Sequence, residues 1–231
     1  MQARRLRQLG IAALLAAALV AVAVVISQGG SDDDGGSGDD TAAVEELFAR
    51  IPQSGTELGE RDAPAEMVEF ADLQCPFCRD YTLDVLPELI DRYVRPGELR
   101  LSLQIVAIIG EDSAEAARVA ATAALQDRMW QFADVFYRNQ GTEETGYVTE
   151  DFLREIAEAT PGLDADTALE DADSPEAERV LAETEAQASR FGIDATPSFV
   201  LGGEGGASER LEVTGLDVES FSGPIERAIG G

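Results

Sequence analysis

Both cysteines of the chain lie in one short motif, Cys75-Pro76-Phe77-Cys78, between a strand candidate and a helix candidate. Proline is favoured at the first position of a helix, where its missing N–H would lack a partner anyway. Cys75 is therefore expected at the N-cap, where free N–H groups and the helix dipole stabilise a thiolate. Cys78 lies nearly one turn later on the same face, as a resolving thiol must. The motif predicts a redox-active pair at a strand-to-helix junction.

Two other uses of the pair are weaker. A structural disulfide across a four-residue loop would restrict the unfolded chain by only about 2 kcal/mol, against about 3 kcal/mol for a fifteen-residue loop. A zinc pair would need two carboxylates as its remaining ligands, since the chain has no histidine and no further cysteine. We therefore predict no metal and no cofactor.

The composition removes the common alternatives to thiol chemistry. The chain has 231 residues and no histidine, and all 17 of its basic residues are arginine. Without histidine there is no Ser/His/Asp or Cys/His pair, and without lysine there is no Schiff base and no P-loop lysine. The net charge of −28 disfavours nucleic acid, whose binding relies on clustered cations.

The N-terminal segment is directed to a membrane. The 18 residues from Leu9 to Ile26 are all apolar or glycine and follow three arginines. As a helix they would span about 27 Å, close to the ~30 Å hydrocarbon core of a bilayer. We expect residues 1–27 to be a single-pass anchor in the cell membrane or, alternatively, a signal segment cleaved near Ala21-Val22-Ala23. In both cases the remaining chain lies outside the cytoplasm, secreted or periplasmic if cleavage occurs.

Residues 28–40 contain glycine, serine, aspartate and one glutamine, with no apolar side chain. Such a segment cannot bury anything, so a flexible acidic linker is expected. Its aspartates lack the spacing of an EF-hand calcium loop. The first 30 residues hold three arginines and no acid, so the rest of the chain carries a net charge of −31.

Hydrophobic patterning predicts an α/β domain over residues 41–231. The expected strands are 67–70, 99–109, 198–201 and 211–214. The expected helices are 43–50, 76–93 with a kink at Pro87, 149–159, 175–191 and 224–229.

The chain between the early and late strands is helical in pattern. Leu125, Met129, Phe132 and Phe136 recur at three- and four-residue spacing and are expected on one face of a helix, as core residues. Strands at both ends with a helical block between them, at about residues 111–192, indicate an α/β sheet domain with a helical insertion.

Two segments carry a resemblance to a known family. Val68–Cys78 and, some 120 residues later, Ala195-Thr196-Pro197-Ser198-Phe199 resemble the DsbA-like thiol:disulfide oxidoreductases, a branch of the thioredoxin fold. The resemblance covers roughly residues 54–229 and implies a helical insertion between the Cys-x-x-Cys helix and the cis-proline strand. Gln74, where thioredoxins usually carry tryptophan, favours this branch. Cys75 and Cys78 are then the catalytic residues.

The resemblance also implies roles for residues around the cysteine pair. Pro197 is expected to be cis and to face the cysteines, with the backbone of Thr196 pairing with a substrate strand. Pro76 and Phe77 are expected to contact substrate. Glu69 matches the buried acid beneath the site, which would carry the proton of the resolving thiol, although its place in a strand alone would equally allow a solvent-facing side chain.

The function implied is a protein disulfide oxidase that introduces disulfides into reduced exported proteins. Its reoxidation would come from a membrane quinone-linked partner of the DsbB or vitamin K epoxide reductase-like kind, and a monomer is expected. Phe77 stands where the best-known DsbA proteins have a histidine that stabilises the thiolate, which leaves the direction of electron flow open.

Two rival functions follow from the same residues. A reductase or isomerase could use the same fold, but residues 41–64 are too short for the separate dimerisation domain of the dimeric isomerases. A non-catalytic extracellular binding module would keep the disulfide as a structural element and use its acidic surface for binding.

Overall fold

A computed structural model describes residues 36–203 and 207–230, and residues 40–231 belong to one compact unit. The predicted anchor or signal segment, residues 1–27, and linker residues 28–35 lie outside the described residues. Among those described, no helix has both the length and the apolar character that crossing a bilayer requires.

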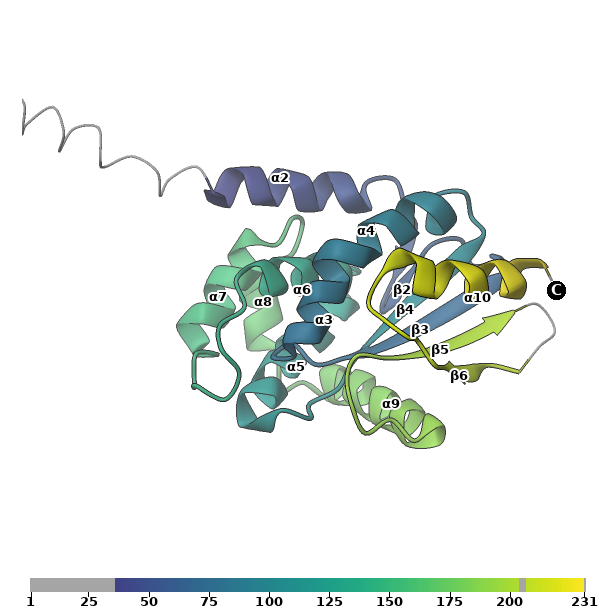
Figure 1. The fold of residues 1–231 in the computed structure, drawn as a ribbon. Helices are drawn as coiled ribbons and strands as arrows, with labels where there is room; N and C mark the ends of the chain where they lie inside the picture. Colours follow the sequence, from purple (N-terminus) through teal and green to yellow (C-terminus); the bar gives the residue numbers. More distant parts are fainter. Residues whose placement is uncertain (1–35, 204–206, 231) are drawn as a thin grey trace, which may run out of the picture. The chain divides into compact units, whose positions relative to one another are not determined.

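A mixed six-stranded sheet lies at the centre of the described unit, with strand order β1-β2-β4-β3-β5-β6 (Figure 1). The strands are β1 (Gln53–Ser54), β2 (Glu57–Leu58), β3 (Ala65–Ala71), β4 (Leu99–Ile105), β5 (Ser198–Gly203) and β6 (Glu209–Leu211). β3 and β4 pair in parallel, and every other neighbouring pair is antiparallel. β3 and β4 are buried along nearly their whole length, although β4 alternates apolar and polar residues. Its buried polar residues Ser102 and Gln104 are hydrogen-bonded to each other at 2.9 Å.

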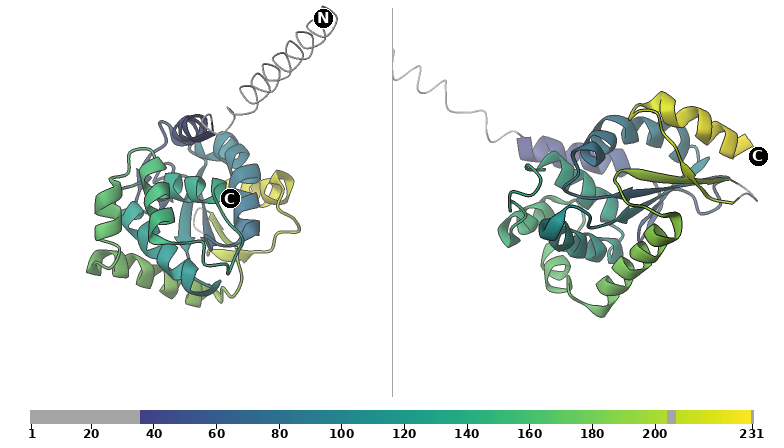
Figure 2. Two further views of the ribbon diagram at one scale, coloured as in Figure 1. Left: turned by 90° about the vertical axis from the view of Figure 1, so that its left-hand side faces the viewer. Right: turned by 60° about the horizontal axis from the view of Figure 1, so that its bottom comes forward.

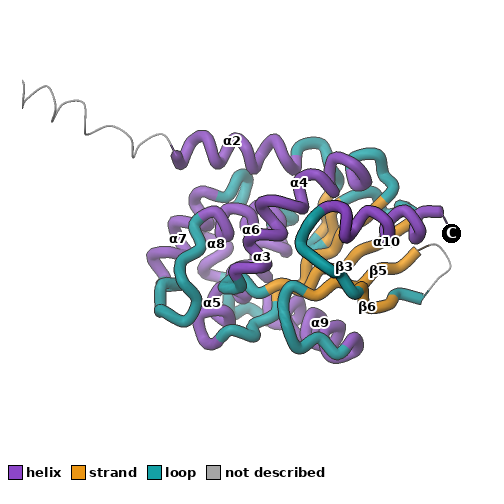
Figure 3. Tube along the Cα trace, viewed as in Figure 1, coloured by secondary structure: helices purple, strands orange, loops and turns teal. Residues whose placement is uncertain are grey.

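Helices cover both faces of the sheet (Figures 2 and 3). The helical segments are α2 (Gly36–Phe48), α3 (Pro76–Asp80), η1 (Tyr81–Val85), α4 (Leu86–Leu89), η2 (Ile90–Val94), α5 (Gly110–Leu125), α6 (Met129–Arg138), α7 (Glu150–Ala159), α8 (Ala165–Glu170), α9 (Pro175–Phe191) and α10 (Val218–Gly230). The continuous segment from α3 to η2, called the cysteine helix below, lies with α10 on one face, and α9 lies on the other. This arrangement confirms the predicted α/β thioredoxin fold with a helical insertion, here α5 to α9.

The cysteine helix runs from Pro76 to Val94, as expected, but it is not uniformly α-helical. The turns η1 and η2, on either side of α4, are π-helical. Pro87 lacks an N–H and its ring crowds the carbonyl of Leu83, so a wider turn before it relieves the clash. The distortion predicted at Pro87 therefore takes the form of π-helical turns.

Alternate residues of β3 face two different cores. Phe199 of β5 contacts Tyr81 and Phe221, with ring centroids 4.7 and 4.9 Å away, in the core under the cysteine helix and α10. Glu69 is paired directly with Phe199 in the sheet and therefore points to the same face. Phe70, the next residue, points to the α9 face. The sheet thus directs Glu69 toward the cysteine helix.

The apolar stripe predicted from Leu125 to Phe136 is wrong at its first residue. Met129, Phe132 and Phe136 are buried, but Leu125 is 45% exposed. Asp127 adopts a left-handed conformation, with φ of 57°, that separates α5 from α6. Because the chain changes direction there, spacing along the sequence no longer places Leu125 on the face of the other three.

The predicted strand over residues 99–109 ends at Ile105. Beyond it the N–H groups of Ile108 and Ile109 donate to the carboxylate of Asp72, at 2.7 and 2.8 Å. Those groups cannot also join a sheet, so the apolar, β-branched pattern overestimated the strand. The strand predicted at 211–214 lies at Glu209–Leu211 instead.

Both terminal helices begin earlier than predicted. α2 starts at Gly36 rather than at residue 43, so residues 36–40 of the expected flexible linker are helical. Asp40 has a folded partner, because its carboxylate lies 3.3 Å from the guanidinium of Arg138. The last helix, expected at 224–229, begins at Val218. Helix α9 matches its predicted bounds and α7 begins one residue later than predicted, with Thr149 and Ser174 as side-chain N-caps.

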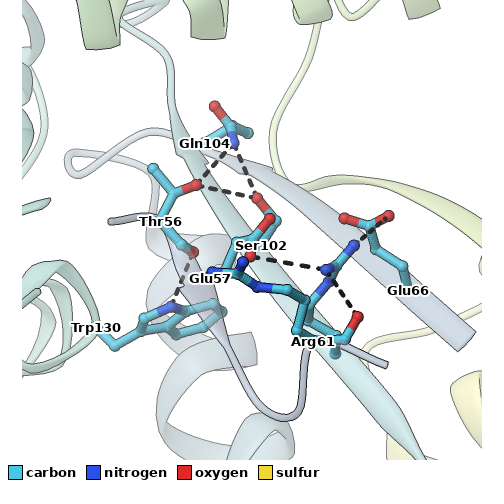
Figure 4. Close-up of polar contacts among 8 residues, drawn as sticks. Thr56, Glu57, Arg61, Glu66, Ser102, Gln104 and Trp130 are labelled. Atoms are coloured by element: carbon cyan, nitrogen blue, oxygen red, sulfur yellow. Dashed lines mark hydrogen bonds and ion pairs between the residues drawn. The ribbon is translucent and has the colours of Figure 1, made fainter. Parts of the chain in front are cut away.

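A short hairpin, β1 and β2, was not predicted, since strands of two residues show no alternation. Its turn residue Thr56 bridges the sheet and the helical insertion (Figure 4). The indole N–H of Trp130 in α6 donates to the Thr56 carbonyl at 3.0 Å. Gln104 Nε2 lies 3.2 Å from Thr56 Oγ1, and Ser102 Oγ lies 3.2 Å from the same oxygen. The hairpin therefore joins α6 to β4.

Phe199→Ala is expected to lower the free energy of unfolding by about 3–5 kcal/mol, since it removes a fully buried ring from between two others. Urea titration measures the loss. Leu125→Ala is the control, and its effect should stay within about 0.5 kcal/mol because that side chain is exposed. Similar losses for the two variants would contradict the burial described.

Candidate active site

The two cysteines occupy unequal positions at the start of α3. Cys75 is the N-cap residue, with extended φ and ψ of −72° and 118°, and Pro76 begins the helix. Cys75 is 3% exposed and Cys78 is fully buried, and both are free thiols. Phe77 between them is 61% exposed. The pair thus lies under a surface formed partly by the motif's own central residues.

The proline segment 121 residues away meets the first cysteine. The Thr196–Pro197 peptide is cis, and the Cys75 thiol donates to the Thr196 carbonyl oxygen at 3.4 Å. Ser198 begins β5 and donates its hydroxyl to the Ala195 carbonyl at 2.7 Å, which closes the turn around the proline. The structure therefore brings together the residues of the two motifs.

The environment separates the acidities of the two thiols. The pKa of Cys75 is lowered from 9.0 to about 6, foremost by a hydrogen bond from the Cys78 thiol. Burial opposes this, and the side-chain hydrogen bond of Thr196 and the N–H groups of Cys78 and Phe77 lower the pKa further. Burial, and then the interaction with Cys75, raise the pKa of Cys78 well above its usual value. At neutral pH the reduced pair is one thiolate and one thiol.

Glu69 lies beneath the pair and is 3% exposed. Its Oε1 is buried and has no hydrogen-bond partner among the described residues. Burial, and secondarily the charge of Cys75, raise the pKa of Glu69 to about 8. Its negative charge in turn contributes to the raised pKa of Cys78. The carboxyl group can therefore hold a proton at neutral pH close to the resolving thiol.

The turn before Cys75 is fixed by Asp72, a residue that the sequence reasoning did not single out. Asp72 is fully buried, and its carboxylate accepts hydrogen bonds from the N–H groups of Gln74, Ile108 and Ile109 and from the hydroxyl of Ser113. These four bonds are 2.6–2.9 Å long. They join the cysteine turn to the start of α5. The available signal was an acid directly after an apolar strand.

Gln74, noted in the sequence only as a family marker, also binds the helical insertion. Its Nε2 donates to the Ile109 carbonyl at 2.5 Å and to Ser113 Oγ at 3.0 Å. Its Oε1 accepts from the N–H of Glu144 at 3.0 Å. The residue before the first cysteine therefore spans the β4–α5 loop and the α6–α7 loop.

Comparison with known proteins places these features in a family. The sequence model of the family described as thioredoxin matches residues 53–212. A probable disulfide bond formation protein D of Bacillus cereus is 32% identical over 161 residues, covering 68% of this chain and 74% of that protein.

Solved structures have the same fold. The crystal structure of oxidised BdbD from Bacillus subtilis aligns with a TM-score of 0.66 and 23% identity, covering 78% of this chain and 98% of that one. DsbA of Chlamydia trachomatis aligns with a TM-score of 0.60 and 20% identity, over 76% of this chain and 89% of that one.

Cys78→Ala is expected to raise the pKa of Cys75 from about 6 toward 9.0, because it removes the hydrogen bond that lowers this pKa most. Thiolate absorbance near 240 nm, followed against pH, measures the change. In Cys75→Ala no thiolate should form near pH 6, since burial keeps Cys78 protonated. A Cys78→Ala protein that still titrates near pH 6 would contradict the assignment.

Glu69→Gln is expected to remove a pH dependence of stability. The folded-state pKa of Glu69 is raised from 4.5 to about 8, so folded protein keeps a proton that the unfolded chain loses in this range. Stability of the reduced native chain should therefore fall as the pH rises from 4.5 to about 8, by a few kcal/mol at most. Urea titrations should give similar stabilities for both proteins near pH 4.5 and a more stable variant near pH 8.5. A difference independent of pH would refute this account.

Proposed function

The chain belongs to the thioredoxin family, in its DsbA-like branch of thiol:disulfide oxidoreductases, and from this premise we propose that it oxidises reduced exported proteins. In this proposal the Cys75–Cys78 disulfide is the oxidant and the domain works outside the cytoplasm. The predicted N-terminal anchor or signal segment supports that location.

One observation carries the proposed direction: the reduced pair holds a stabilised thiolate at Cys75. Whatever stabilises the reduced form makes the disulfide a stronger oxidant. A thiol pKa of about 6 is lower than the ~7 of thioredoxin, a reductant, and higher than the ~3.5 of the strongest oxidants of this kind. We therefore propose an oxidant of intermediate strength.

Phe77 does not prevent this stabilisation. The stabilising groups are the Cys78 thiol, the Thr196 side chain and the backbone N–H groups of Phe77 and Cys78, and none depends on the side chain at position 77. The groups that lower the pKa of Cys75 are all neutral, and the chain has no histidine. This absence is consistent with a pKa above that of the histidine-containing relatives.

The proposed reaction has two exchange steps. A substrate thiolate attacks Cys75, the Cys75–Cys78 bond breaks, and the Cys78 sulfur takes the electron pair and a proton, which Glu69 supplies. A second substrate thiolate then attacks the substrate sulfur of the mixed disulfide, and Cys75 leaves as a thiolate. The substrate loses two electrons and the cysteine pair gains them.

Substrate and redox partner are assigned by the resemblance. The backbone of Thr196, beside Pro197, would pair with the substrate segment next to Cys75, and the exposed Pro76 and Phe77 would contact it. A membrane quinone-linked thiol oxidase would restore the disulfide. These assignments complete a cycle in which electrons pass from exported proteins through the cysteine pair to the membrane.

The reduction potential of the Cys75–Cys78 couple tests the direction. Equilibration with glutathione should give a value between about −120 and −200 mV, and a value near −270 mV would instead identify a reductase. Cys75→Ser should lose oxidation of a reduced test protein and keep its circular dichroism spectrum. Unfolding of this variant, in a protein whose wild type shows no redox activity, would support the binding module.

A further inference from the structure

Gln140 reaches from the helical insertion to both sides of the residue before the first cysteine. It lies two residues after the end of α6 and is half-buried. Its Nε2 donates to the Leu73 carbonyl at 2.7 Å and to the Cys75 carbonyl at 3.2 Å. An amide nitrogen carries two hydrogens, so these two bonds use its whole donor capacity.

The end of α6, from which Gln140 extends, is itself held by hydrogen bonds. Tyr137, near the end of α6, is 1% exposed and donates its hydroxyl to the Asp72 carbonyl at 3.1 Å. Asn139 donates its side-chain amide to the Val135 carbonyl at 2.8 Å. The amide of Gln140 therefore projects from an ordered helix end that already contacts the cysteine turn.

Hydrogen bonds to the Cys75 carbonyl control the orientation of the peptide between Cys75 and Pro76. The peptide between Cys75 and Pro76 has no N–H, so hydrogen bonds can orient it only through its oxygen. That oxygen accepts from the N–H of Arg79 at 3.2 Å and from Gln140 at 3.2 Å. One bond comes from the helix itself, and the other comes from the insertion.

The orientation of this peptide decides where the helix donors point. The backbone N–H groups of Phe77 and Cys78 act on the Cys75 sulfur. They do so because Cys75 keeps an extended N-cap conformation while Pro76 begins the helix. Rotation of the peptide would turn the sulfur away from these donors. This rotation would destabilise the reduced state, in which Cys75 is a thiolate, more than it would destabilise the disulfide state.

We propose that Gln140 is a positioning residue for thiol:disulfide exchange, which holds the Leu73 and Cys75 carbonyl groups so that the donors at the start of α3 face the Cys75 sulfur. Gln140 thereby acts on the chemistry of the cysteine pair through two backbone carbonyl groups. The proposal rests on the exchange activity of the pair and is independent of the direction in which electrons flow.

Gln140→Leu tests the proposal, because leucine fills similar space and donates no hydrogen bond. The acid dissociation constant of Cys75 should fall about two- to tenfold, the range of one ordinary hydrogen bond. The equilibrium with glutathione should shift toward the disulfide, since the thiolate form is the one weakened. Thiolate absorbance against pH and glutathione titration measure the two changes.

Gln126→Leu is the matched control. Gln126 lies in the same insertion, where its amide accepts from the N–H of Asp164 at 2.9 Å and donates to the carbonyl of the same residue at 3.1 Å. The substitution therefore also removes two side-chain bonds to the backbone, at a place that does not contact the cysteine turn. Its melting temperature should fall, while the acidity of Cys75 and the glutathione equilibrium should match the wild type.

The outcomes separate positioning from a merely structural role. If Gln140→Leu lowers the melting temperature but leaves the Cys75 acidity and the glutathione equilibrium unchanged, the proposal is overturned. If that variant does not fold, Gln140→Asn keeps a polar amide but is too short to reach both carbonyls, and the same shifts are expected from it. The wild-type potential alone tests the oxidase function, so the failure of one proposal is distinguishable from the failure of the other.

Discussion

The buried carboxylate of Asp72 is the interaction on which the arrangement of this domain depends. A carboxylate removed from water is strongly destabilising unless donors replace its hydration, and here three backbone N–H groups and one hydroxyl do so. Two of those N–H groups, of Ile108 and Ile109, come from the loop after β4, and the third comes from the cysteine turn. One side chain therefore fixes the loop after β4, the start of the insertion and the turn before α3. A change in the position of any one of these three segments would disturb the other two.

The chemistry of the pair arises from the difference between two neighbouring positions on a helix. The N-cap places Cys75 among unpaired donors, whereas Cys78, one turn further, enters the apolar core between the sheet and the helix. The same core receives Glu69 because alternation along β3 directs it there. The protonation states of Cys75, Cys78 and Glu69 thus follow from their positions on the helix and the strand. No cation or imidazole is needed to produce them.

The parts of this structure that could be predicted from the sequence are those governed by local rules. Pro76 after Cys75 marked a helix start, and the helical pattern placed α7 and α9 within one residue of their observed bounds. The helical insertion followed from periodicity, and the proline segment came from family resemblance. What could not be predicted was non-local: the partners of Asp72 and Gln140 lie up to 67 residues away in sequence, and no pattern near them identifies a hydrogen bond across that separation. Leu125 failed for a related reason, since one left-handed residue breaks the period that its assignment assumed.

The absence of histidine has a consequence for how this protein exchanges protons with its surroundings. Near neutral pH most proteins titrate through imidazole groups, which would mask small changes at an active site. Here Cys75, with a pKa of about 6, and Glu69, with a pKa of about 8, titrate in the range that imidazole groups occupy in other proteins. The protons taken up or released when the pair changes oxidation state are therefore those of Cys78, Cys75 and Glu69, with no imidazole among them. The number of protons that the whole protein takes up on reduction therefore reports mainly on its active site.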